Sequence, residues 1–151
     1  MAEAHGLGVV LYSPLAGGLL TGKYRRGEQG RLTTRAAGGE ATAQRTAVLD
    51  AVLAIAGELE TTPAQVSLAW LRCRAADAQT SMSLIVGPRT SAHLTEYLSA
   101  LDVELGDQHY QRLAEISAIQ LGVPHEDVAA ALSQGVDGNR RLLDPPRVTV
   151  R

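Results

Sequence analysis

One segment near the start of the chain dominates its interpretation: Gly6-Leu7-Gly8-Val9-Val10-Leu11-Tyr12-Ser13-Pro14-Leu15-Ala16-Gly17-Gly18-Leu19-Leu20-Thr21-Gly22-Lys23. The apolar run from Val9 to Leu11 does not alternate, which is typical of a strand covered on both faces in a parallel sheet. Pro14 cannot donate a hydrogen bond to a neighbouring strand, so we expect the strand to stop there. The glycines that follow predict a turn whose backbone can lie close to a bound anion.

A second strand and glycine turn come later in the chain. Leu84 to Val86 predicts a buried strand, and Gly87-Pro88-Arg89 predicts a turn. Thr90 or Ser91 is the expected N-cap of a short helix. We expect three leucines of this helix to face inward: Leu94, Leu98 and Leu101. A strand followed by a helix, twice, predicts the α/β class with parallel strands, and something further must complete so small a sheet.

Helical spacing and capping signals predict the remaining elements. The expected helices are Thr42–Leu59, Pro63–Ala76, Asp107–Ala118 and a last one from Pro124 to Gly135. Between Lys23 and these helices, residues 24–41 have no apolar period and predict a long mobile loop. Its arginines either close over a bound dinucleotide or belong to a solvated loop.

Length and composition limit the classes of protein that need to be considered. With 151 residues, 45% of them hydrophobic, and a formal net charge of −2, the chain predicts a single globular domain and does not favour a nucleic-acid partner. No long apolar run predicts a membrane span or a leader, so we expect a cytoplasmic protein. Cys73 is the one cysteine, and its helical spacing predicts a small buried core residue. The four histidines have no metal-ligand spacing, and we assign no metal site.

Three segments in order carry a resemblance to a known family. They are Gly6 to Tyr24, then Thr62-Pro63-Ala64-Gln65-Val66-Ser67-Leu68-Ala69-Trp70-Leu71, then Ile85-Val86-Gly87-Pro88-Arg89-Thr90. Together they resemble the C-terminal part of an aldo-keto reductase, from the first residues to about Ala118. The resemblance implies a partial (β/α)8 TIM barrel that contains the last two β/α units and the C-terminal helices. We assign this barrel portion to residues 1–135 and expect residues 136–151 to be a flexible tail.

The resemblance also implies NADP(H) as cofactor, and it names the residues that would hold it. Beside the pyrophosphate it places Ser13, Pro14, Leu15 and Gly18. Beside the adenosine and its 2′-phosphate it places Gly87, Arg89, His93, Glu96 and Tyr97. Free backbone amides at turns and the planar guanidinium of Arg89 are suited to phosphate oxygens.

The chain departs from the family pattern at two kinds of position. His93 and Tyr97 stand where the family often has glutamine and asparagine, so we expect cofactor binding to be weakened or lost. The family's aspartate, tyrosine, lysine and histidine for hydride and proton transfer come from earlier strands, and their motifs do not occur here. We therefore assign no catalytic residue and expect the chain alone to be inactive as an oxidoreductase.

Several functions stay open at the level of the sequence. The chain is part of a truncated or split NADP(H)-dependent carbonyl/alcohol oxidoreductase, or a stand-alone half-barrel that acts as a non-redox catalyst, binding module or structural protein. A half-barrel that dimerises and builds a site between subunits is a third possibility. An open parallel edge predicts a homo-oligomer or a complementary N-terminal half as partner. Gly17 to Lys23 also fits a GxxxxGK P-loop, but Tyr24 stands where that motif needs Ser or Thr.

Overall fold

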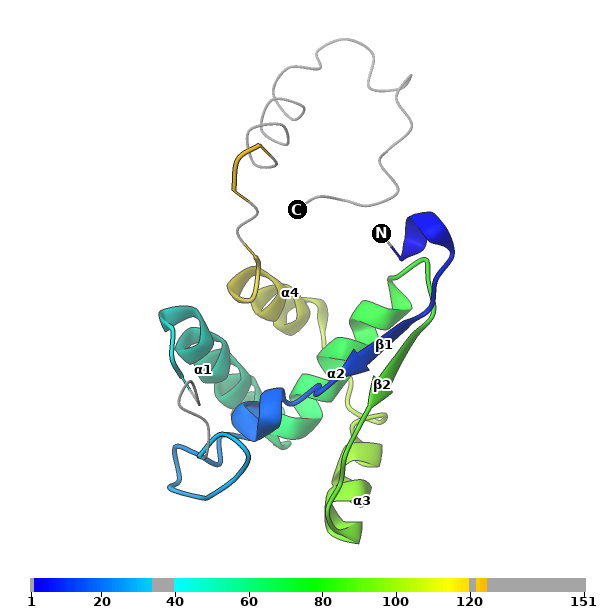
Figure 1. Cartoon of the computed structure of the whole chain (residues 1–151). Helices are drawn as coiled ribbons and strands as arrows, with labels where there is room; N and C mark the ends of the chain where they lie inside the picture. The colour runs from blue at the N-terminus through cyan, green and yellow to red at the C-terminus, as the bar shows by residue number, and fades with distance from the viewer. Residues whose placement is uncertain (1, 34–39, 120–121, 125–151) are drawn as a thin grey trace. The chain divides into compact units, whose positions relative to one another are not determined.

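The computed structural model describes residues 2–33, 40–119 and 122–124 (Figure 1). The chain divides into two compact units, Met1–Ser117 and Ala118–Arg151. The fold below is that of the first unit. The predicted helix up to Gly135 and the predicted tail 136–151 fall on residues after Pro124, outside the described part of the chain.

The described elements of the first unit are short helices with two strands placed among them. In order they are the 3-10 helix η1 (Glu3–His5), β1 (Val9–Tyr12), the 3-10 segment η2 (Ala16–Thr21), α1 (Ala43–Glu58), α2 (Pro63–Ala76), β2 (Met82–Ile85), α3 (Ser91–Ser99) and α4 (Asp107–Ile116). The predicted α/β class is confirmed.

The two strands pair in parallel, as predicted, and lie side by side in Figure 1. Their register sets Val9 opposite Met82 and Tyr12 opposite Ile85. This ladder corrects the predicted limits Leu84–Val86, because pairing with β1 begins at Met82 and ends at Ile85. Both strands therefore end at the same edge, and the two glycine turns leave the sheet next to each other.

The expectation that both faces of the strands are covered is wrong for the described residues. Burial alternates along both β1 and β2, and Val10 and Tyr12 are 62% and 79% exposed. On the other face, Leu84 packs against a buried cluster that includes Leu68 of α2. An apolar run without alternation indicates that both faces are suited to burial, but helices cover only one of them here.

Helices α1, α2 and α4 form the main core. Leu49 and Ile55 of α1 and Val66 of α2 are fully buried, and Leu113 of α4 packs into the same cluster as Ile55 and Val66. The helical spacing that predicts a helix over Thr42–Leu59 is thereby confirmed. The indole N–H of Trp70 donates to a backbone carbonyl of α4 at 3.3 Å, which adds a polar contact between α2 and α4.

Local capping signals set helix boundaries, and the predicted start of α2 at Pro63 is confirmed. The hydroxyl of Thr62 accepts the Gln65 backbone N–H at 3.2 Å, and the Gln65 side chain accepts the Thr62 backbone N–H at 3.1 Å. This reciprocal capping box begins α2 at Pro63. Gly6, with a φ of 62°, ends η1 in the left-handed conformation that glycine adopts easily.

Two burial predictions are wrong. Leu94, Leu98 and Leu101 are exposed, because α3 packs instead through Tyr97 and the following Ala100. The leucine spacing identifies a stripe, but no described element covers that stripe. Cys73, predicted to be buried, is only half-buried, because it lies near the end of α2. Its thiol is free.

The described part of the segment 24–41 is irregular, as predicted, but it is tied to α1. Arg25 donates two hydrogen bonds to Glu40, at 2.6 and 2.7 Å, and one to Asp50 at 2.5 Å. These contacts hold the pKa of Glu40 below its ordinary value. No described helix has both the length and the apolar character that a membrane span requires.

Candidate functional site

A pocket of about 560 Å³ lies where the carboxyl ends of β1 and β2 meet. This volume is in the range of ordinary small-molecule sites. All nine residues selected from the sequence line it: Ser13, Pro14, Leu15, Gly18, Gly87, Arg89, His93, Glu96 and Tyr97. The structure thus brings together two groups of residues that lie about seventy positions apart in the chain, because the parallel register places both turns at one edge.

The first turn has an unusual backbone that fixes the floor of the pocket. Ser13 adopts a positive φ of 57°, and Gly17 and Gly18 have φ values of 67° and 92°. The Ser13 hydroxyl accepts the Gly17 backbone N–H at 3.1 Å, which holds the turn closed. A Cβ atom on Gly18 would lie only 2.8 Å from Cε of Lys23. The positive φ therefore favours glycine here, and a side chain at this position would displace the flexible end of Lys23.

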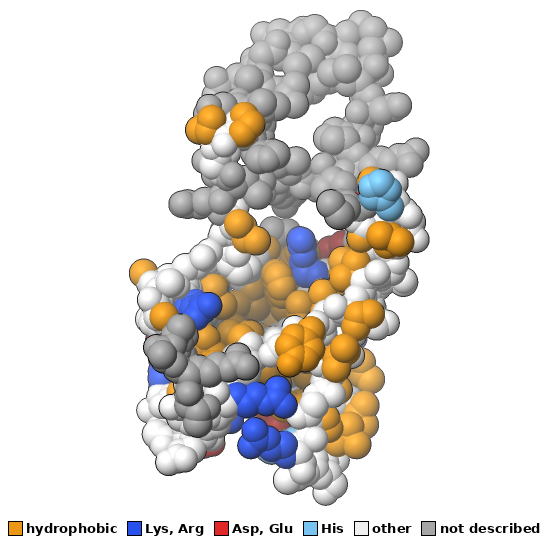
Figure 2. Space-filling view, in the orientation of Figure 1, with side chains coloured by type: hydrophobic (Ala, Val, Ile, Leu, Met, Phe, Trp, Pro, Cys, Tyr) orange, Lys and Arg blue, Asp and Glu red, His pale blue; other side chains and the backbone are white. Residues whose placement is uncertain are grey.

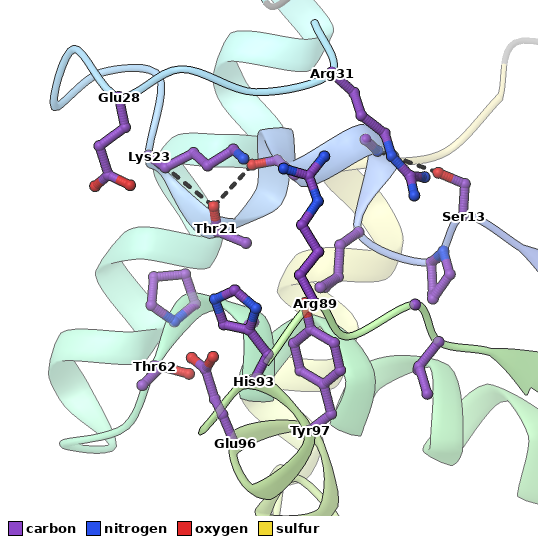
Figure 3. A pocket seen from close by; sticks show the side chains of 18 of the residues that line it. Ser13, Thr21, Lys23, Glu28, Arg31, Thr62, Arg89, His93, Glu96 and Tyr97 are labelled. Atoms are coloured by element: carbon purple, nitrogen blue, oxygen red, sulfur yellow. Dashed lines mark hydrogen bonds between the residues drawn. The ribbon is translucent and has the colours of Figure 1, made fainter. Parts of the chain in front are cut away.

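A tyrosine ties the following loop to this turn. The Tyr24 hydroxyl donates to the Gly17 carbonyl at 2.8 Å and accepts the Leu32 backbone N–H at 3.2 Å. The Lys23 ammonium lies 5.1 Å from the centroid of the Tyr24 ring, within the range of a cation–π contact. Tyr24 thus connects the turn to Leu32, the residue that follows Arg31, and both Lys23 and Arg31 line the pocket (Figure 3).

The second turn adds cationic groups from the opposite side. Arg89 follows Gly87, and a Cβ atom on Gly87 would lie 4.0 Å from Nη2 of Arg31. The Thr90 hydroxyl caps α3 by accepting the His93 backbone N–H at 3.2 Å. The remaining amides of the first helical turn have no acceptor within the helix, so they carry partial positive charge.

Helix α3 contributes three side chains to the pocket: His93, Glu96 and Tyr97. In Figure 3 they rise from one side, while Lys23, Glu28 and Arg31 come from the loop on the other. Burial raises the pKa of the Tyr97 phenol, and the nearby Glu96 carboxylate raises it further. The guanidinium groups of Arg31 and Arg89, which line the same pocket, act on this pKa in the opposite direction.

The charge of the pocket favours an anionic ligand. Lys23, Arg31 and Arg89 line it, and Figure 2 shows Lys and Arg side chains beside apolar ones on this face. A fourth lining cation, Arg26, is paired with Glu28 at 2.8 Å. Among the described residues, no group of three or more His, Cys, Asp or Glu side chains is placed to hold a metal ion.

Sequence reasoning identified the pocket residues that follow the two strands but missed Lys23 and Arg31 as lining residues. Of the loop arginines, Arg26 and Arg31 line the pocket, whereas Arg25 is bound to Glu40 and Asp50. Nothing in the local sequence distinguishes Arg25 from the other two. The P-loop alternative is wrong, because no described helix follows Lys23 before α1 begins at Ala43.

Comparisons with known proteins agree with this architecture. A model of the aldo/keto reductase family matches residues 1–118. The chain is 32% identical over 111 residues to the uncharacterized oxidoreductase YrpG of Bacillus subtilis (strain 168), a match that covers 74% of this chain and 32% of that protein. It is 33% identical over 106 residues to the probable voltage-gated potassium channel subunit beta of Arabidopsis thaliana, covering 66% of this chain and 31% of that protein.

The chain therefore spans about a third of the length of these curated relatives. The family model covers most of it, including both strands, both glycine turns and the helices up to α4. On this evidence, the chain belongs to the aldo/keto reductase family.

Proposed function

We propose that this chain holds NADP(H) within an NADP(H)-dependent oxidoreductase that interconverts carbonyl compounds and alcohols. The observation that carries the proposal is one cation-lined pocket that contains both glycine turns and all nine residues expected to hold the cofactor. Membership of a family of reductases supports the same activity class. We further propose a cytoplasmic location.

The residues present fit a dinucleotide that carries an additional phosphate. Such a ligand has negative charge at two separate places, and the pocket contains two separate glycine turns that we propose as its anion-binding sites. The turn at Ser13–Gly18, with Lys23 beside it, would hold the pyrophosphate. Arg89 and the first turn of α3 would hold the 2′-phosphate, because a guanidinium fork and helix amides both favour phosphate oxygens. The bound cofactor would supply the hydride of the reduction.

The residues of this chain position the cofactor, and we propose that they do not complete the reaction. None of the lining residues matches the family's groups for proton transfer, and Tyr12, the lining tyrosine at the end of β1, is 79% exposed. We propose that further strands supply those groups. The same strands would cover the exposed side chains of Val10, Tyr12 and Ile85, which leave the sheet open on one face. A complementary N-terminal half is the partner we favour, and a second copy of this chain is the alternative.

Titration of the purified chain with NADPH, followed by cofactor fluorescence, tests the binding part of the proposal. We expect saturable binding that is weakened by the departures at His93 and Tyr97 and is tighter for NADPH than for NADH, because only NADPH carries the 2′-phosphate that we place near Arg89. Absence of binding up to about 1 mM, which corresponds to a free energy of only about −4 kcal/mol, would contradict it.

A kinetic assay tests the second part. The chain alone is expected to give no NADPH-dependent reduction of aldehydes or ketones, and co-expression with a complementary N-terminal half is expected to restore it. Turnover by the chain alone would refute the division of labour. Light scattering measures the association state. A chain that stays monomeric at high concentration would contradict self-association through the exposed face of the sheet.

A further inference from the structure

Tyr24 does not line the pocket, but its hydroxyl joins two segments that contribute lining residues. The hydroxyl donates to the Gly17 carbonyl of the first turn at 2.8 Å and accepts the Leu32 backbone N–H of the loop at 3.2 Å. The loop also packs directly on the turn, since a Cβ atom on Gly17 would lie 3.2 Å from Cδ2 of Leu32. A phenol can donate one hydrogen bond and accept another at the same time, whereas phenylalanine fills the same space and can do neither.

The backbone around Arg31 is held on both sides. The Thr33 backbone N–H donates to the Gly30 carbonyl at 3.1 Å, and the Thr33 hydroxyl donates to the same carbonyl at 2.7 Å. Arg31 is the second residue of the turn that these bonds close. The N–H that Tyr24 accepts belongs to the peptide bond between Arg31 and Leu32. The phenol hydroxyl therefore fixes the backbone immediately after Arg31 and connects it to the first turn of the pocket.

Arg31 reaches from this loop to the second turn. A Cβ atom on Gly87 would lie 4.0 Å from Nη2 of Arg31, and the side chain runs from the loop into the pocket in Figure 3. Arg31 is exposed, and ordering a long exposed side chain costs conformational entropy when a ligand binds. A fixed backbone removes the share of this cost that comes from the loop. Arg31 in this position therefore binds an anion more tightly than the same side chain on a free loop.

Lys23 depends on a different part of Tyr24. The Lys23 ammonium lies 5.1 Å from the centroid of the ring, a contact that phenylalanine also makes. The ring and the hydroxyl therefore act on separate cations. We propose that Tyr24 is a positioning residue for the cofactor: its hydroxyl holds Arg31 beside the second turn, where the guanidinium meets a phosphate of the bound dinucleotide. This inference rests on the proposed function, since it concerns the same cofactor.

A double-mutant cycle on the full chain tests this role, with NADPH fluorescence as the measurement. Tyr24→Phe should weaken NADPH binding by about 3- to 10-fold, the range of one hydrogen bond. Arg31→Ala should weaken it by about 10-fold or more, because a charged contact is lost. In a chain that already carries Arg31→Ala, Tyr24→Phe should change binding by less than about twofold, since the hydroxyl then has no guanidinium to position.

Tyr110→Phe is the matched control, because Tyr110 lies on α4 and does not line the pocket. This variant should bind NADPH like the unaltered chain, and circular dichroism on each variant confirms that the helices remain folded. Amide hydrogen exchange measures the contact without any ligand. The Leu32 amide should exchange about 3- to 10-fold faster in Tyr24→Phe, because it loses its acceptor.

The results that would overturn the inference differ from those that would overturn the proposed function. An unchanged exchange rate at Leu32 would refute the contact itself. If Tyr24→Phe binds NADPH like the unaltered chain, or loses the same factor with and without Arg31, the positioning role alone is wrong. Equal losses mean that the hydroxyl acts only on the first turn. Failure of the unaltered chain to bind NADPH would overturn the proposed function and this inference together.

Discussion

Substitution of Gly18 by alanine tests whether the first glycine turn needs a residue without a side chain, so that its backbone keeps a positive φ and Lys23 can lie against it. Gly18 has a φ of 92° and a ψ of 5°, and an added Cβ would lie 2.8 Å from Cε and 3.2 Å from Nζ of Lys23. Alanine must therefore adopt an unfavourable backbone conformation, and Lys23 must move away from the turn. The first effect lowers stability, and the second displaces a cation from the pocket.

The magnitude follows from the first of these effects. A non-glycine residue at such a φ costs about 1–2 kcal/mol, whereas the flexible end of Lys23 moves aside at little cost. The reduced entropy of the unfolded chain offsets about 0.4–1 kcal/mol of this. The net loss is about 0.5–1 kcal/mol of unfolding free energy. With a urea slope of about 2 kcal/mol/M, the unfolding midpoint should fall by about 0.3–0.5 M.

Urea denaturation followed by circular dichroism measures this change, with Gly57→Ala as the matched control. Gly57 lies inside α1, and a Cβ atom there would meet nothing within 4 Å. That variant should be stabilised by about 0.5–1 kcal/mol, because alanine is the better helix former. NADPH binding should weaken roughly fivefold in Gly18→Ala, for about 1 kcal/mol of lost charge contact, and stay unchanged in Gly57→Ala. Equal stability and equal binding of Gly18→Ala and the unaltered chain would refute the reasoning.

Three further predictions concern charge and burial. Arg89→Ala should weaken NADPH binding by about 10- to 100-fold and leave NADH binding nearly unchanged in calorimetric titrations, and equal losses for both would contradict a 2′-phosphate contact. Hydrogen bonds from His109 and an arginine of α4 lower the pKa of the Glu58 carboxyl in the folded chain. These contacts therefore stabilise the fold fully above the ordinary carboxyl pKa, and the stabilisation is lost as the pH falls through the lowered pKa of the folded state. Glu58→Gln should therefore lose less stability than the unaltered chain in urea melts taken between about pH 6 and 3. Leu49→Ala, at a fully buried position, should cost about 2–5 kcal/mol. Leu98→Ala, at a position 55% exposed, should stay within about 0.5 kcal/mol, unless a partner covers α3.

Features that depend on neighbours in the chain were predictable from the sequence. The capping box at Thr62 and the glycine that ends η1 depend on hydrogen bonds and dihedral angles within a few residues. The buried stripe of α1 was predictable for a similar reason, because helical spacing alone selects which side chains share a face. The nine residues proposed to hold the cofactor came from family motifs, and they line one pocket.

Features that depend on distant partners were not predictable. Leu94 and Leu98 have the spacing of a buried stripe, yet Tyr97 and Ala100 make the contact of α3 with the core. Likewise, Arg25 and Arg31 stand in the same polar loop. Only the folded chain places Arg25 against Glu40 and Asp50 and Arg31 beside Gly87.

The sequence by itself determined the kinds of element, the capped start of α2 and the family, because periodicity, caps and motifs are local properties of the chain. Only the tertiary structure decided which faces are covered and which charges meet. The parallel register of β1 with β2 brings the two turns to one edge, and the hydroxyl of Tyr24 ties the loop to the first of them. Both are contacts between segments whose spacing in the sequence carries no signal, so they exist only once the chain has folded.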